Sequence, residues 1–68
     1  MKAKITYCYP RMFVTKRGEP IIRENQIGEI VDAVYRNGNT EILFSDFSFV
    51  KIFGDAFKDK GPMQLEVL

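Results

Sequence analysis

Three observations predict an all-β domain arranged as a compact barrel. Glycine and proline recur at short intervals along the 68 residues, which is the rhythm of short strands joined by turns. Stretches in which apolar and polar residues alternate lie between these turns, as expected for strands with one buried face. Asn37-Gly38 separates two apolar runs, and Asn-Gly is the strongest short signal for a β-hairpin. A chain of this length forms one domain, so we expect residues 1–68 to be a single small barrel.

The elements follow from these patterns in chain order. Residues 2–9 form the first expected strand, in which Ile5, Tyr7 and Tyr9 share one face. Pro10 ends or bends this strand because proline lacks a backbone N–H. A long early loop with a turn around Gly18 follows, interrupted by brief apolar runs. Residues 63–68 alternate again and form the expected closing strand.

The stretch from residue 25 to residue 36 supports two interpretations. Its apolar side chains, at positions 27, 30, 31, 34 and 35, have the spacing of one helix face. A helix at residues 25–36 would make the fold α+β. However, isoleucine, valine and tyrosine are mediocre helix formers, and the Asn-Gly turn that follows favours a hairpin of residues 29–36 and 40–45. We adopt the hairpin and keep the helix as the alternative.

Short strands, a long early loop and one tight hairpin form a familiar pattern. The stretch 26–34 (QIGEIVDAV), the turn Asn37-Gly38, the stretch 41–46 (EILFSD) and the final LEVL resemble small SH3-like barrels of the KOW type. The resemblance implies a five-stranded SH3-like barrel. Relatives of this architecture bind proteins, peptides, RNA or larger enzyme complexes, and fold alone does not select among these functions.

The composition argues against catalysis. The chain has no histidine, which is the commonest general base and the commonest metal ligand. Cys8 is its one cysteine, so we expect no disulfide, no metal site and a small half-buried thiol. No glycine motif for phosphate binding is present. We therefore expect a non-enzyme without cofactors, without a signal peptide or membrane segment, and in the cytoplasm.

The first functional hypothesis is a protein-interaction module, such as a small regulatory or inhibitory factor or an accessory subunit. Hydrophobic residues make up 46% of a chain too short to bury them all. If residues 42–53 are extended, one face carries Ile42, Phe44, Val50 and Ile52 and the other carries Leu43, Phe47, Phe49 and Phe53. If Ser45-Asp46 is a turn, most of these side chains enter the core. The candidate contact residues are Phe47, Phe49, Lys51 and Phe53, since aromatic residues are enriched at interfaces. The closing strand also presents an edge through which copies of the chain would pair.

The alternative hypothesis is a barrel that binds RNA or single-stranded DNA. Residues 1–23 carry six basic residues and one acid, a net charge of +5, although the whole chain carries only +1. A basic surface with aromatic platforms suits single strands. The candidate basic residues are Arg11, Lys16, Arg17 and Arg23, with Tyr7, Tyr9 and Phe13 as stacking partners. The opposing interpretation places the three rings in the core and leaves the basic residues as solvated charges.

Overall fold

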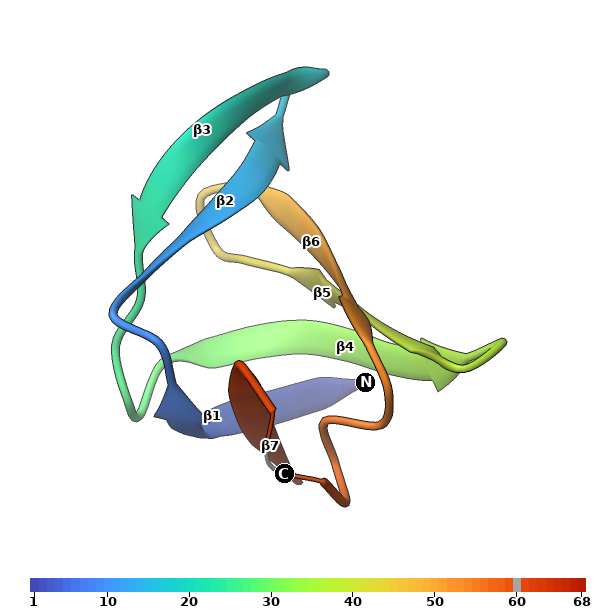
Figure 1. The fold of residues 1–68 in the computed structure, drawn as a ribbon. Coiled ribbons are helices and arrows are strands. Elements are labelled where there is room, and N and C mark those ends of the chain that lie inside the picture. The colour runs from blue at the N-terminus through green and yellow to red at the C-terminus, as the bar shows by residue number, and fades with distance from the viewer. Residues whose placement is uncertain (60) are drawn as a thin grey trace.

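The computed structural model describes residues 1–59 and 61–68, and these residues form an all-β fold. They form seven strands and no helix: β1 (Lys2–Cys8), β2 (Arg11–Lys16), β3 (Glu19–Glu24), β4 (Ile30–Arg36), β5 (Asn39–Leu43), β6 (Phe49–Phe53) and β7 (Met63–Val67). The seven strands join one antiparallel sheet in the order β3-β2-β6-β5-β4-β1-β7. Figure 1 shows that this sheet is strongly curved, with the β2–β3 hairpin at one end and β1, β4 and β7 at the other.

Two tight turns set the register of the hairpins. Asn37 and Gly38 both have positive φ, 54° and 79°, and they connect β4 to β5 as the sequence predicted. Arg17 and Gly18 have φ of 52° and 80° and connect β2 to β3 in the same way. Positive φ at both central residues belongs to the turn type whose twist matches that of paired strands.

The prediction of a long early loop was therefore wrong, because this stretch is the β2–β3 hairpin. Lys16 pairs with Glu19 across the turn, and Arg11 pairs with Glu24 at the other end. The signal was weak because Ile21-Ile22 is a very short apolar run and because proline at position 20 disfavours an interior strand. As an edge strand with a neighbour on one side only, β3 accommodates this proline.

The alternative helix at residues 25–36 is also excluded, since Ile30–Arg36 is strand β4. Its residues pair with β5 on one side and with β1 on the other. The helical spacing arose because Ile27 lies in the preceding loop, outside the strand whose alternation begins at Ile30.

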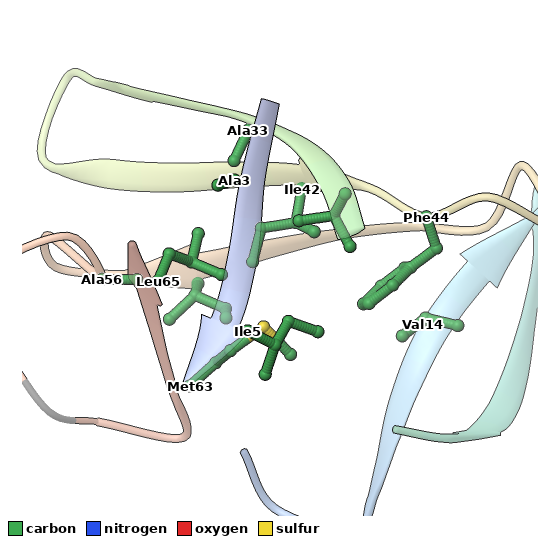
Figure 2. Close-up of a cluster of buried hydrophobic side chains, with 11 residues drawn as sticks. Ala3, Ile5, Val14, Ala33, Ile42, Phe44, Ala56, Met63 and Leu65 are labelled. Carbon is green, nitrogen blue, oxygen red and sulfur yellow. The ribbon is translucent and has the colours of Figure 1, made fainter. Parts of the chain in front are cut away.

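The core lies on the concave side of the curved sheet and draws on β1, β4, β5, β6 and β7, with one residue from β2. Figure 2 shows the ring of Phe44 and the side chain of Val14 at the β2 side of this cluster. The buried apolar residues are Ala3, Ile5, Val14, Val31, Ala33, Ile42, Phe44, Ile52, Ala56, Met63 and Leu65. Among the residues placed by the structure, none belongs to a helix long and apolar enough to cross a membrane.

Candidate functional site

Strand β6 places three of the four predicted contact residues on one outward face. Phe49, Lys51 and Phe53 alternate with Val50 and Ile52, which face the core. Phe53 is 92% exposed, and Phe49 is 37% exposed. The structure thus decides between the two interpretations of these aromatic residues: a turn does separate β5 from β6, yet the rings of β6 stay on the surface.

Phe47, the fourth predicted contact residue, lies in the turn between β5 and β6. Its φ is 66°, a value that bulky residues rarely adopt, and its side chain is 79% exposed. Its N–H donates a hydrogen bond to the C=O of Phe44 at 3.0 Å. The backbone therefore holds an aromatic ring in solvent at a position that suits glycine or asparagine better.

Neighbouring strands extend the apolar surface beyond β6. Leu43 of β5 pairs directly opposite Phe49, while Phe13 of β2, 72% exposed, pairs with Ile22 of β3. We call the set Phe13, Ile22, Leu43, Phe49 and Phe53 the outer apolar face. Sequence reasoning missed the contribution of Ile22 because the β2–β3 hairpin was not expected.

Two shallow depressions on this surface meet at Phe49. The first, of about 180 Å³, is bordered by Met1, Val34 and Leu43. The second, of about 290 Å³, lies between β2 and β6 and is bordered by Phe13, Val14, Val50 and Lys51, among others. Phe49 contributes to both, so it occupies the centre of the outer apolar face.

The second depression is a groove created by the divergence of two strands. Within the part of the chain that the structure describes, β2 and β6 pair at one position, Thr15 opposite Phe49. Beyond this pair the two strands separate, as Figure 1 shows. Val14 and Val50, which pack against the core from the inner side, border the groove and give it an apolar floor.

Lys51 lies at the rim of this groove. Glu41 lies opposite Lys51 in the ladder, but its carboxylate accepts two hydrogen bonds from Arg36, at 2.8 and 3.1 Å. The bonds from Arg36 lower the pKa of Glu41 below its usual value, and the positive charges of Arg36 and Lys51 lower it further. Among residues 1–59 and 61–68, no ion pair includes Lys51. A carboxylate of a partner would find this ammonium group available.

The basic residues predicted to contact nucleic acid do not gather in one place. Arg11 begins β2, whereas Lys16 ends it and Arg17 lies in the following turn. At about 3.3 Å per residue, the two groups lie roughly 17 Å apart along the strand. Arg11 also lies 3.5 Å from the carboxylate of Glu24.

Arg23, the fourth predicted basic residue, is engaged inside the protein. Its side chain is 11% exposed, and its guanidinium donates two hydrogen bonds to the carboxylate of Glu29, at 3.0 and 2.5 Å. It also donates to Asp46 at 3.4 Å and to Asn25 at 3.1 Å. Burial by itself would lower the pKa of Arg23, but the bonds to Glu29 and the charge of Asp46 raise it. This guanidinium is not presented to a phosphate.

Tyr7 and Tyr9 lie at the end of β1, apart from Lys16 and Arg17. Their rings make an edge-to-face contact, with centroids 6.3 Å apart and planes at 75°. Tyr9 is exposed and Tyr7 half-buried, and the C=O of Tyr9 accepts a hydrogen bond from Asn25. Tyr9 and Phe13 both reach solvent close to Arg11 in the chain, and Phe13 shares one face of β2 with Arg11. Tyr9, Arg11 and Phe13 are therefore residues of the alternative hypothesis that reach solvent near one another.

The thiol of Cys8 is half-buried at the end of β1. Burial, and secondarily the negative charge of Glu29, raise the pKa of Cys8. A raised pKa lowers the thiolate fraction and with it the nucleophilicity of the thiol.

Comparisons with protein-family models, with curated proteins and with solved structures found no match for this chain, so its function must be inferred from its own residues.

Proposed function

We propose that this protein is a non-enzymatic protein-interaction module, a small regulatory or inhibitory factor or an accessory subunit, which docks on a larger protein. The contact residues in this proposal are Phe47, Phe49, Lys51 and Phe53, extended by the rest of the outer apolar face. The observation that carries the proposal is the 92% exposure of Phe53 on the same strand face as Phe49.

Energetic considerations support an interface at this position. Covering an exposed phenylalanine ring contributes about 2 kcal/mol, and aromatic residues are common among the few that dominate binding energy. The side chains of Phe13 and Phe53 are largely exposed to solvent. Phe49 borders both depressions. Interfaces combine apolar and aromatic side chains with charged neighbours, and the charged neighbours of Phe49 are Glu41 beside the first depression and Lys51 beside the second.

A finer statement on the fold belongs to the same proposal. We regard the sheet as a variant of the SH3-like barrel, with the β2–β3 hairpin inserted between the first two barrel strands. The pairing of β1 with both β4 and β7 supports this, as does the antiparallel series β4-β5-β6. The five barrel strands are then β1, β4, β5, β6 and β7.

The non-enzymatic and cytoplasmic parts of the proposal rest on composition and on the site. The chain has no histidine and one cysteine, and burial raises the pKa of that cysteine. Small secreted domains depend on several disulfides, which one cysteine cannot supply. The depressions are shallow and apolar, which suits contact better than chemistry.

The test is affinity capture from cells of the native host with three forms of the protein. Phe53→Ser removes the most exposed ring, and Ile27→Ser is the matched control because Ile27 is also exposed but lies in the loop before β4. We expect a saturable protein partner that wild type and Ile27→Ser retain and Phe53→Ser loses.

Equal capture by all three forms, or no partner above background, would contradict the proposal. Titration of a labelled single-stranded oligonucleotide with the protein tests the nucleic-acid alternative. Binding that is strong at about 50 mM salt and collapses by about 200 mM would favour the nucleic-acid alternative through Tyr9 and Arg11.

A further inference from the structure

We infer that the groove between β2 and β6 takes an extended segment of the partner protein, which pairs with β6 as an additional strand; this inference rests on the proposed function. The groove is bordered by two strands that separate after a single pair. What identifies the occupant is the direction in which the backbone groups of β6 point.

The ends of the β5–β6 ladder establish that direction. The N–H of Phe44 donates to the C=O of Ser48 at 2.9 Å, and the N–H of Gly54 donates to the C=O of Gly38 at 2.8 Å. Both pairs belong to the register of the two strands between them. Because hydrogen-bonded pairs alternate along an antiparallel ladder, even-numbered residues of β6 direct their backbone groups toward β5. Odd-numbered residues direct theirs to the opposite side.

On that opposite side, the odd-numbered residues of β6 meet different environments. Phe49 pairs with Thr15 of β2. In the part of the chain described here, Lys51 and Phe53 have no partner strand on this side, because β2 has already separated. Their N–H and C=O groups therefore point toward the side of β2. Lys51 borders the groove and Phe53 follows it along β6, so an incoming strand would find two consecutive pairing positions.

The two outer strands of the sheet, β3 and β7, are better protected against pairing with another strand than the open stretch of β6. Strand β3 carries Pro20, which lacks an N–H, and charged residues at both ends, and both features discourage strand pairing. Beside β7, the N–H of Leu65 already donates to the C=O of Ala56 at 2.8 Å. In the described part of the chain, the open stretch of β6 has no proline and no covering segment, and Lys51 is its one charged residue.

The side chains around the groove describe the segment it would accept. Val14 and Val50 form an apolar floor, Phe13 borders it, and the exposed ring of Phe53 lies two residues beyond Lys51 on the same face of β6. Lys51, which makes no ion pair among the described residues, supplies a positive charge at the rim. The matching partner segment is extended, alternates apolar side chains along one face, and carries an acidic residue opposite Lys51. Such strand addition is a recurring mode of peptide recognition, with main-chain bonds supplying affinity and side-chain contacts supplying specificity.

The experiment selects binders from a displayed library of random linear peptides of about ten residues, the upper length of ordinary strands. Amide hydrogen exchange of the wild-type protein is then measured with and without a selected peptide. We expect enrichment of acidic peptides with alternating apolar residues, and slowed exchange at the amides of Lys51 and Phe53.

A pair of variants separates the backbone contact from the ring contact. Phe53→Ala removes the ring and keeps the N–H, whereas Phe53→Pro removes both, without disturbing the bonds to β5. We expect Phe53→Pro to bind selected peptides about five- to tenfold more weakly than Phe53→Ala, the effect of one lost hydrogen bond. Lys51→Glu should weaken the acidic peptides further.

Three results would overturn the inference. One is selected peptides that bind without slowing exchange at Lys51 and Phe53, and another is a library that yields no binder. The third is self-association in sedimentation that protects these two amides, which would assign the groove to a second copy. In each case the capture experiment with Phe53→Ser and Ile27→Ser still decides the proposed function independently, since it reports on the outer apolar face rather than on strand pairing.

Discussion

The guanidinium of Arg23 lies 3.9 Å from the centre of the Phe44 ring, so that a basic residue from β3 covers the largest fully buried side chain of the core. The same guanidinium holds Glu29 and Asp46, which come from the loops on either side of the β4–β5 hairpin. Arg23 thereby ties the β2–β3 hairpin to the rest of the sheet. Its role is structural, in contrast to the surface role that its position in a basic segment suggested.

Arg23→Met should destabilise the fold by about 3 kcal/mol, because it leaves the carboxylate of Glu29 half-buried without its partner. Urea unfolding at neutral pH measures the change. Arg11→Met is the control, since Arg11 also pairs with one carboxylate, that of Glu24, but both side chains lie at the surface. A loss of stability as small as that of Arg11→Met would show that the Arg23 cluster does not hold the hairpin.

Substitution by alanine should change the free energy of unfolding strongly at one phenylalanine and hardly at all at another. Phe44→Ala should cost about 3–5 kcal/mol because it empties a fully packed position. Phe53→Ala should change the free energy of unfolding by no more than about 0.5 kcal/mol because the ring is in solvent. Urea titrations of both variants beside wild type check the pair. A large destabilisation by Phe53→Ala would place this ring in contacts that remove it from the outer apolar face.

Phe47→Gly should stabilise the protein and weaken partner binding. Glycine removes the left-handed strain at φ 66°, a gain of about 0.5–1 kcal/mol after its own entropy cost. Phe53→Gly is the control, because it removes an equally exposed ring from a strand and should destabilise by about 0.5–1 kcal/mol. Thermal unfolding and capture of the partner give the two measurements. If Phe47→Gly lowered stability, the turn would depend on the ring rather than tolerate it.

The stability of the fold should fall on acidification through the range in which Asp46 titrates. Hydrogen bonds from Ser48, with a contribution from Arg23, lower the pKa of Asp46 from 3.8 to about 2. A lowered pKa means that the ionised carboxylate stabilises the fold above pH 3.8, and that this contribution is lost as the pH falls toward about 2.

Ser48→Ala isolates this contribution from those of the other carboxyl groups. It removes the hydroxyl that donates to Asp46 at 2.5 Å, so the pKa of Asp46 should rise toward its ordinary value. The variant should lose less stability than wild type between pH 3.8 and about 2, as measured by urea unfolding alongside an NMR titration of Asp46. Parallel stability curves for the two proteins would show that the Ser48 bond does not set this pKa.

Several local features were predictable because neighbouring residues determine them. Asn37-Gly38 specifies a tight hairpin, and the structure confirms the pairing of β4 with β5. The alternation in residues 42–53 correctly grouped Ile42, Phe44 and Ile52 apart from the outward-facing phenylalanines. The grouping holds on both sides of the turn at Ser45-Asp46, because β6 pairs with β5 in a register that keeps these side chains on the same face of the sheet.

The sequence by itself therefore determined the all-β class, the Asn37-Gly38 hairpin and the division of side chains between two faces. Only the tertiary structure decided which face is buried, because alternation defines two faces and long-range pairing selects one. It also decided that Arg23 turns inward to Phe44 and Asp46 and that β2 leaves β6 after a single pair. Those features depend on contacts between residues distant in the chain, which no local pattern of charge or hydrophobicity encodes.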